Sequence, residues 1–458
     1  MSMTIEEMIK KQQEYFAAGK TCELAQRIQA LNRLEQGILN CEQELYAALK
    51  KDLGKSRAES YMCEVGLTLS ELRFVKKHVQ KWSREKRVPT PLAQFHARSF
   101  TVQEPYGVVL VMSPWNYPVL LTLEPLIGAL AAGNCCVLKP SAYSPATSAV
   151  MKKMIADVFP EEYVTVIEGG REENQNLLSQ KFDYIFFTGG VQVGKMVMEK
   201  AAANLTPVTL ELGGKSPCII DKSANLKMTA KRLAFGKYLN CGQTCVAPDY
   251  VLVHEAVKEE FLKLLKSEIR VMYGEDPLKN PDYGKMINRK HFDRVLGLMK
   301  EEKLILGGEN DTESLRIAPA VMDQVTEDDA VMQEEIFGPL LPILTVGSME
   351  EAIAFVNRRP KPLALYLFTE NRETEKNVLE YTSFGGGCIN DTIIHLATSQ
   401  MGFGGVGNSG MGSYHGKKSF ETFSHEKSIV KKYTWMDLPM RYQPYTGWKE
   451  KLVRMFVK

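Results

Sequence analysis

The sequence predicts an α/β protein made of two doubly wound domains with a small additional β element. First, short apolar segments alternate with helical segments from Tyr106 onward. Second, segments such as Gly107–Met112 are apolar at nearly every position, which is typical of parallel strands buried on both faces. Third, the alternation starts again after Gly214, and 458 residues are enough for two such units.

Residues 1–88 precede the alternating pattern and are expected to be helical. Leucine, isoleucine and alanine recur three and four positions apart from Ile5 to Lys51 and again from Ser60 to Trp82. The basic run Lys76–Arg87 is interpreted as a solvated helix face. Prolines end this pattern, and Phe100–Pro105 is expected to form a strand at an edge or in a projecting hairpin.

The two α/β units are expected to contain strands and helices in alternation. In the first unit, strands are expected at 107–112, 135–138, 163–167, 183–187 and 208–210, and helices at 121–132, 144–158, 172–178 and 193–203. In the second unit, strands are expected at 218–220, 250–253, 342–345, 365–368 and 387–390, and helices at 225–239, 256–272 and 349–357. The boundary between the units is placed near Thr209–Gly214.

Composition excludes several classes of protein. The formal net charge is +2, so nothing indicates a nucleic-acid partner. The nine cysteines show no zinc-site spacing, which favours a protein without a metal and a reducing, cytoplasmic location. The charged N-terminus is unlike a secretory signal, and no apolar run is long enough to span a membrane. The tail Trp448–Lys458 is too short and too charged for that role.

The segment Gly236–Pro248 joins a predicted helix to a predicted strand. Gly242 is expected to end the helix and to permit a tight turn, which presents Cys245 at the junction. A thiol at such a junction can point into a cleft surrounded by backbone N–H groups, as a nucleophile requires. It can equally be an inert buried cysteine, and the local pattern leaves both interpretations open.

Two glycine-containing segments are candidates for phosphate binding. Gly405–Gly410 has GxGxxG spacing, but it does not follow a strand and open a helix, so it is interpreted as a loop. In Phe187–Gly194 a predicted strand ends, two glycines follow and a helix begins, so backbone N–H groups could face a pyrophosphate. An ordinary strand–helix turn explains the same spacing, and that alternative also stays open.

Four motifs occur in one order along the chain: Pro114-Trp-Asn-Tyr-Pro118, Leu210-Glu-Leu-Gly-Gly-Lys-Ser-Pro217, Asn240-Cys-Gly-Gln-Thr-Cys245 and Gln333-Glu-Glu-Ile-Phe-Gly-Pro339. With Leu138-Lys139-Pro140 and Phe187-Thr-Gly189, they resemble the aldehyde dehydrogenase superfamily from about Tyr46 to Lys427. Three further segments are similar to its class 3 branch, which acts on fatty and aromatic aldehydes: Val246–Tyr250, Lys361–Leu365 and Phe403–Phe423.

The resemblance implies a division of the chain into functional parts. It implies a Rossmann-like NAD(P)-binding domain at 1–88 and 105–209 and a catalytic domain at 210–420. It also implies bridging or oligomerisation strands at 89–104 and 421–445, followed by a tail at 446–458. The same comparison with class 3 relatives, together with the short N-terminus, indicates a homodimer.

The resemblance assigns catalysis to three residues. Cys245 is the nucleophile, because hydride leaves an aldehyde carbon readily only after attack has made that carbon tetrahedral. The Asn116 side-chain amide and the backbone N–H of Cys245 hold the oxyanion that develops. Glu211 is the general base for hydrolysis of the thioester, a role favoured by a pKa that burial raises toward neutrality.

The resemblance also implies NAD or NADP as the cofactor. Lys139 matches the lysine that binds the adenosine ribose, and Glu335 matches the carboxylate that holds the nicotinamide ribose, with Phe337 packed beside it. Ala142 stands where many relatives have a glutamate that repels a 2′-phosphate, so NADP is expected to be accepted alongside NAD. The other implied cofactor-binding residues are Trp115, Thr188, Gly189, Gly190, Gly194 and Leu212.

The expected substrate is an aldehyde with a sizeable apolar group. The candidate pocket residues are mostly apolar or aromatic: Tyr61, Tyr117, Leu120, Thr244 and Ile393. A CoA-acylating dehydrogenase is an alternative that would have no need of the base Glu211, and an inactive relative is a second. A cysteine hydrolase would require a histidine partner, and the seven histidines show no recognisable pairing motif with Cys245.

Overall fold

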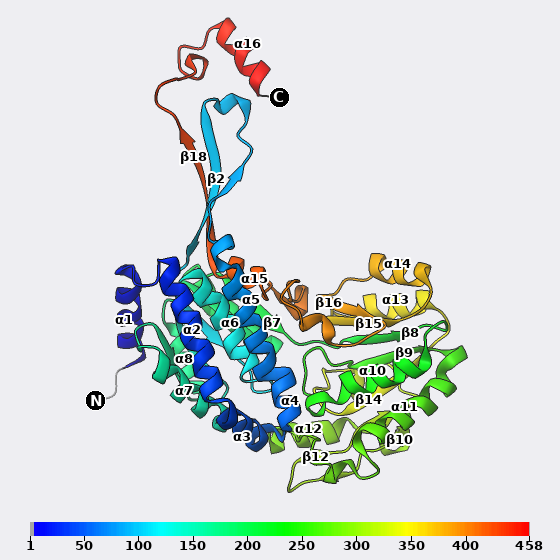
Figure 1. Ribbon diagram of the computed structural model, residues 1–458. Coiled ribbons are helices and arrows are strands. Elements are labelled where there is room, and N and C mark those ends of the chain that lie inside the picture. The colour runs from blue at the N-terminus through cyan, green and yellow to red at the C-terminus, as the bar shows by residue number, and fades with distance from the viewer. Residues whose placement is uncertain (1–3, 458) are drawn as a thin grey trace.

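The computed structural model describes residues 4–457 and contains two mainly parallel sheets, as predicted (Figure 1). The first sheet has the strand order β17-β7-β6-β3-β4-β5, and all neighbouring strands are parallel except β17, which is antiparallel to β7. Its strands are β3 (Val108–Met112), β4 (Cys135–Lys139), β5 (Val164–Val166), β6 (Tyr184–Gly189), β7 (Val208–Leu212) and β17 (Gly410–Met411).

The first sheet is doubly wound around its central strand β3. The chain adds β4 and β5 on one side and then returns to add β6 and β7 on the other. Every residue of β3 is buried, as its continuous apolar sequence predicted. The helices that accompany this sheet are α1 (Ile5–Ala17), α2 (Leu24–Asn40), α3 (Glu42–Leu53), α4 (Arg57–Ser60), α5 (Gly66–Trp82), α6 (Leu120–Ala132), α7 (Pro145–Val158), α8 (Arg171–Ser179), α9 (Val191–Ala202) and α15 (Lys417–Thr422).

The second sheet has the order β10-β13-β14-β9-β8-β15-β16 and is parallel apart from the edge strand β10. Its strands are β8 (Pro217–Ile220), β9 (Tyr250–His254), β10 (Leu304–Leu306), β13 (Ala320–Met322), β14 (Leu340–Val346), β15 (Ala364–Phe368) and β16 (Gly386–Ile389). Its helices are α10 (Leu226–Tyr238), α11 (Lys258–Tyr273), α12 (Arg289–Leu298), α13 (Met349–Asn357) and α14 (Arg372–Tyr381). A small hairpin pairs β11 (Asn310–Asp311) with β12 (Arg316–Ile317).

A projecting arm forms the third part of the molecule. In Figure 1, β2 (Ala97–Pro105) and β18 (Ser424–Lys432) leave the body side by side, and the terminal helix α16 (Gly447–Phe456) lies at the far end. The prediction of a projecting hairpin is therefore confirmed, although the partner of β2 on one side is the distant β18. One expectation was wrong: α5 ends at Trp82, and the last basic residues of the run interpreted as a helix face lie in β1 (Lys86–Val88), paired with β2.

Helix α6 explains the most apolar stretch of the sequence. All of its residues are buried, so it packs on every side and needs no polar face. In the part of the chain that the structure describes, every helix is too short or too polar to cross a membrane. The apolar stretch therefore belongs to the interior of the first unit.

Candidate active site

The turn that carries Cys245 joins α10 to β9. The predicted helix ends slightly earlier than expected, before a run of three residues in the left-handed region: Asn240, Cys241 and Gly242 have φ angles of 51°, 55° and 73°. A side chain cannot be added at Gly242, because a Cβ atom there would lie 2.2 Å from the carbonyl oxygen of Gly338. This compact reversal places Cys245 at the edge of the core rather than within it.

Cys245 lines two cavities at once. One is a cleft of about 580 Å³ with many polar groups in its wall. The other is a cavity of about 220 Å³ whose wall is almost entirely hydrocarbon and aromatic. Of the nine cysteines, all free thiols, Cys245 is the one that lines both cavities. This position favours the nucleophile interpretation over that of an inert cysteine, which would be packed in the core and face neither cavity.

The larger cleft lies at the carboxyl ends of the central strands of the first sheet. It is lined by residues that directly follow β3, by the turn after β6 and by the end of β7. The strand order reverses between β3 and β6, and in doubly wound sheets a ligand binds at such a switch point. Seven predicted cofactor residues line the cleft. Five lie at these three places, namely Trp115, Thr188, Gly189, Gly190 and Leu212, and Glu335 and Phe337 come from the second unit.

Glu211 lines the cleft from the end of β7. Its side chain is buried, and neither carboxylate oxygen has a hydrogen-bond partner. Burial therefore raises the pKa of Glu211 well above its ordinary value. The glycine-rich segment covers part of the Glu211 side chain. Gly410 of β17 pairs with Glu211, and a Cβ atom on Gly404 would lie 3.2 Å from Glu211 Oε1. The segment is thus structural rather than a phosphate loop.

Two further polar atoms in the cleft wall have no hydrogen-bond partner in the protein, and a bound dinucleotide could provide one. They are the hydroxyl oxygen of Thr188 and Oε1 of Glu335. Burial, followed by repulsion from Asp249, raises the pKa of Glu335 to about 8. Gly213 leaves space for this carboxylate, because a Cβ atom there would lie 2.1 Å from Glu335 Oε2. A ribose hydroxyl would satisfy such buried acceptors, so these residues fit the cofactor that the sequence implies.

The surroundings of Cys245 favour the protonated form of its thiol in the free protein. Burial is the main cause that raises its pKa, to about 12, and the negative charges of Glu335 and Glu211 act in the same direction. These two carboxylates therefore influence the sulfur electrostatically. A thiolate forms in this site only when a proton leaves to a base.

Asn116 is tied directly to the turn that carries the thiol. Its side-chain Nδ2 donates to the backbone carbonyl of Gln243 at 2.9 Å, and the residue also lines the cleft. The amide has a second N–H that can donate to an oxygen bound near Cys245. The next residue contacts the same turn, since the Tyr117 hydroxyl lies 2.7 Å from the Thr244 hydroxyl.

The apolar cavity contains four of the five predicted pocket residues: Tyr117, Leu120, Thr244 and Ile393. The prediction for Tyr61 was wrong, because its side chain is 49% exposed and does not line the cavity. Tyr61 begins a single turn of π-helix, η1 (Tyr61–Val65), and the following residues Met62 and Cys63 line the cavity instead. A π-helical turn changes which residues of a helix face inward. No pattern in the sequence predicted this turn.

Two predicted cofactor residues do not line the cleft. The Lys139 side chain is buried, and its Nζ donates to the carbonyls of Pro140 and Gly169 at 2.8 and 2.7 Å. Gly194 lies inside α9, where a Cβ atom would come within 2.6 Å of Leu212 Cδ2. Gly194 therefore allows α9 to approach β7 closely, which is a packing role.

Several residues of the two cavities were not anticipated. The cleft is also lined by His291 and Arg294 of α12, a helix that was not predicted although its buried residues Phe292, Val295 and Leu298 recur at helical spacing. The apolar cavity is also closed by Phe403, Tyr414 and a buried pair, His415 with Glu124. These residues lie far from Cys245 in sequence, so only the fold reveals that they meet it.

Comparison with known proteins agrees with this geometry. The family model described as "Aldehyde dehydrogenase family" matches residues 2–429. The chain is 47% identical to 4,4'-diaponeurosporen-aldehyde dehydrogenase of Staphylococcus aureus, covering 99% of both proteins. It is 44% identical to aldehyde dehydrogenase family 3 member B1 of Mus musculus, covering 97% of this chain and 95% of that protein.

A solved structure described as the substrate-bound state of Staphylococcus aureus AldH has the same fold. It superposes with a TM-score of 0.98 at 46% identity, and the match covers 100% of both chains. The predicted α/β architecture is therefore confirmed at the level of the whole chain. From its sequence, its fold and the cavities on either side of its thiol, the chain belongs to the aldehyde dehydrogenase family and is an oxidoreductase that acts on aldehydes.

Proposed function

We propose that the protein oxidises medium- or long-chain aliphatic or aromatic aldehydes to carboxylic acids, with NAD or NADP as the hydride acceptor. The observation that supports this most directly is the position of Cys245 between an apolar cavity and a polar cleft. An aldehyde whose hydrocarbon part fills the cavity would present its carbonyl carbon to the thiol. A nicotinamide in the cleft would then lie on the other side of that carbon.

Cys245 would begin the reaction by transferring its proton to a base and attacking the carbonyl carbon, which gives a thiohemiacetal. Asn116 Nδ2 and the backbone N–H of Cys245 would donate hydrogen bonds to the new oxyanion. Loss of one such donor typically lowers the rate about 100- to 1000-fold. The cofactor, when bound, accepts the hydride that the carbon releases, and the acyl group stays on sulfur as a thioester.

Glu211 would complete the turnover. The thioester carbon is attacked by water, and the carboxylate of Glu211 accepts a proton from that water. The carbon–sulfur bond then breaks, which releases the carboxylic acid and returns the thiol. A carboxylate that is buried and has no hydrogen-bond donors nearby is a stronger base than one in water, so the environment of Glu211 suits this step.

A panel of acetaldehyde, hexanal, dodecanal and benzaldehyde tests the substrate class. The ratio kcat/KM is expected to rise by about tenfold or more from acetaldehyde to hexanal, because each buried methylene contributes about 0.8 kcal/mol. Equal efficiency with acetaldehyde would contradict the proposed substrate class. An increase in turnover on addition of CoA would instead support the acylating alternative.

The proposal includes the use of both dinucleotides. Ala142 is exposed in the turn after β4 and carries no charge that could repel a 2′-phosphate. The variant Ala142→Glu should raise the KM for NADP by about tenfold and leave the KM for NAD within about twofold. A preference of the unaltered protein for NAD above about a thousandfold, roughly 4 kcal/mol, would contradict this part of the proposal.

We also infer that the protein works as a homodimer in a reducing compartment such as the cytoplasm. All nine cysteines are free, which suits such a compartment. The arm formed by β1, β2 and β18 projects from the body (Figure 1), and a thin sheet of this kind is marginally stable alone. A second copy that covers the arm would supply the missing packing.

A further inference from the structure

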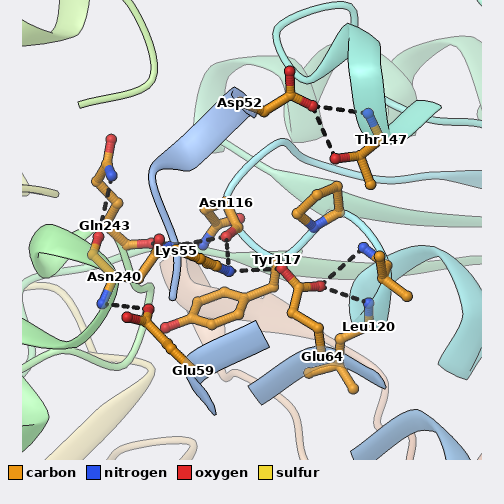
Figure 2. Close-up of polar contacts among 12 residues, drawn as sticks. Asp52, Lys55, Glu59, Glu64, Asn116, Tyr117, Leu120, Thr147, Asn240 and Gln243 are labelled. Atoms are coloured by element: carbon orange, nitrogen blue, oxygen red, sulfur yellow. Dashed lines mark hydrogen bonds and ion pairs between the residues drawn. The ribbon is translucent and has the colours of Figure 1, made fainter. Parts of the chain in front are cut away.

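A cluster of buried charged residues lies beside Asn116. Its members come from the N-terminal helical segment: Lys55, Glu59 and Glu64. The side chains of Lys55 and Glu64 are completely buried and form an ion pair of 2.6 Å. None of the three lines the cleft or the apolar cavity, so none can touch a ligand there. Figure 2 shows how they surround Asn116 and Tyr117.

Lys55 holds the backbone of the Asn116 segment. Its Nζ donates to the carbonyl oxygen of Asn116 at 2.9 Å and also lies 3.9 Å from the centre of the Tyr117 ring (Figure 2). An ammonium above an aromatic face is attracted by the ring electrons. One buried charge therefore contacts two consecutive residues, one with a side chain at the cleft and one with a side chain at the apolar cavity.

Glu64 fixes the other end of the same segment. Its Oε1 receives the Lys55 ammonium, and its Oε2 accepts from the backbone N–H groups of Val119 and Leu120 at 2.9 and 3.0 Å. These N–H groups lie at the start of α6, where a negative charge is favourable. Glu64 is placed there by the π-helical turn η1, a feature that often marks functional sites.

The turn that carries the thiol is tied to the same point. Glu59 Oε1 accepts from the backbone N–H of Asn240 at 3.0 Å, and Asn240 Nδ2 donates to the carbonyl of Asn116 at 2.8 Å. The carbonyl of Asn116 thus accepts two hydrogen bonds, one from Lys55 and one from Asn240. Asn116 Nδ2 in turn donates to Gln243. The backbone carbonyl and the side-chain amide of Asn116 are therefore both held in place relative to the Cys245 turn.

A buried ion pair is a poor means of stabilising a fold, because desolvation of two charges offsets most of their attraction. Its advantage here is geometric. A donor to an oxyanion must already be aimed at the place where the charge develops, and a shift of about 1 Å can cost about 100-fold in rate. Lys55 and Glu64 restrict Asn116 at its carbonyl and at the residues that follow it.

We propose that Lys55, held by Glu64, is a positioning residue that aligns the Asn116 amide for the oxyanion formed on the substrate. This inference rests on the proposed role of Asn116. Lys55 touches neither substrate nor cofactor in this arrangement and acts through the backbone of Asn116. It should therefore affect the chemical steps rather than the binding of the aldehyde.

The test uses the full-length protein with the paired substitution Lys55→Met/Glu64→Gln. Removing both charges avoids an uncompensated buried charge, and the amide oxygen of glutamine can still accept from Val119 and Leu120. We expect kcat with hexanal to fall about 10- to 100-fold, with the KM for hexanal unchanged within about threefold. Alkylation of Cys245 by iodoacetamide should keep its rate within about twofold, because the thiol itself is not altered.

A double-mutant cycle shows whether the pair acts through Asn116. Asn116→Ala alone should lower kcat by about 100-fold or more. Adding Lys55→Met/Glu64→Gln to Asn116→Ala should then cause little further loss, because there is no amide left to align. If the two losses multiply instead, the pair acts independently of Asn116 and the inference is wrong.

A matched control removes another partly buried ion pair, Lys258–Asp323, which borders neither cavity. Lys258→Met/Asp323→Asn should leave kcat unchanged. If Asn116→Ala keeps full activity, the proposed oxyanion role is wrong and the inference falls with it. If Asn116→Ala is slow while folded Lys55→Met/Glu64→Gln has full kcat, only the inference fails.

Folding is checked by circular dichroism and thermal melting. Should the paired variant not fold, Lys55→Met alone is measured, because burial raises the pKa of Glu64 and so favours the neutral carboxyl once the ammonium is gone. The same loss of kcat at constant KM is expected from that variant. Full kcat there would overturn the inference.

Discussion

The reactivity of Cys245 should depend on pH in a way that its surroundings determine. Burial and the charges of Glu335 and Glu211 raise the thiol pKa to about 12. The thiolate fraction of the free protein therefore increases with pH between pH 7 and 10, by less than about tenfold per pH unit where Glu335 gains its charge. Iodoacetamide alkylation of Cys245, followed by mass spectrometry of the modified peptide, should accelerate in proportion.

Removal of the charge at Glu335 should make this thiol more reactive. The pKa of Glu335 is raised to about 8, so the carboxyl is largely neutral at pH 6 and charged at pH 9. Glu335→Gln should therefore speed alkylation at pH 9 and change it little at pH 6. Equal acceleration at both pH values would show that the substitution acts on access to the sulfur rather than on its pKa.

Substitution of Glu211 should separate the two halves of the reaction. Glu211→Gln is expected to give a rapid release of about one NADH per active site and then turnover slowed about 100- to 10,000-fold, since the thioester waits for a base. Stopped-flow absorbance at the NADH band measures both phases. A slow first phase would place the role of Glu211 before thioester formation.

The same variant has a built-in stability control. A carboxyl whose pKa is raised in the folded state opposes folding progressively as pH rises from its unfolded pKa, about 4.5, toward the folded value. Glu211→Gln removes this opposition, so its melting temperature should exceed that of the unaltered protein at pH 8 and match it near pH 4.5. A lower melting temperature at pH 8 would mean that misfolding explains the slow turnover.

At the scale of elements, the turn after α10 depends on one glycine. Gly242→Ala would place a Cβ atom 2.2 Å from the Gly338 carbonyl in a left-handed backbone, so we expect a loss of about 1–3 kcal/mol in stability and a kcat at least about tenfold lower. Gly297→Ala is the matched control, because that helical glycine of α12 has open space around it and should gain up to about 1 kcal/mol. Urea unfolding and steady-state kinetics measure both. Equal effects of the two substitutions would contradict this account.

The elements that the sequence predicted best are those whose burial is uniform. The strand β3 and the helix α6 are apolar at nearly every position. Such segments are stable only when they are buried on all sides, as both are here. The position of the Cys245 turn was also predicted. A glycine between a helix and a strand marks a turn from the local sequence alone. The helix α16 in the tail was not predicted. Prolines and aromatic residues lie near it in the sequence, and none of its own residues is buried.

The parts that could not be predicted depend on contacts distant in sequence. Residues 404–411 have the spacing of a phosphate loop, yet they pair with β7 and cover Glu211, which only the sheet topology shows. Lys55 and Glu64 belong to the segment that was predicted to be helical, and no motif or spacing singled them out. Their burial follows from the π-helical turn and from the packing of that segment on α6, and neither leaves a periodic signal.

At the scale of the whole molecule, the candidate active site is built from residues of both units. Asn116 and Glu211 extend from the first sheet, whereas Cys245 and Glu335 belong to the second unit. The chain passes from β7 to β8 within a few residues and later returns to add β17 beside Glu211. The chain therefore passes beside the candidate site at two places that are distant in sequence.

The arm provides the last prediction, the oligomeric state. Side chains that a monomer would shield are exposed on it: Val430 of β18 is 53% exposed, and Trp435 and Trp448 beyond it are 67% and 52% exposed. Because exposed apolar side chains on this arm favour association, light scattering should give twice the mass of the chain. Ile429→Asp/Val430→Asp should give a monomer, whereas Leu205→Asp, at a position 90% exposed on the body, should not. A dimer that survives the arm substitutions would place the interface on the body, and the arm would then need another explanation for its exposed side chains.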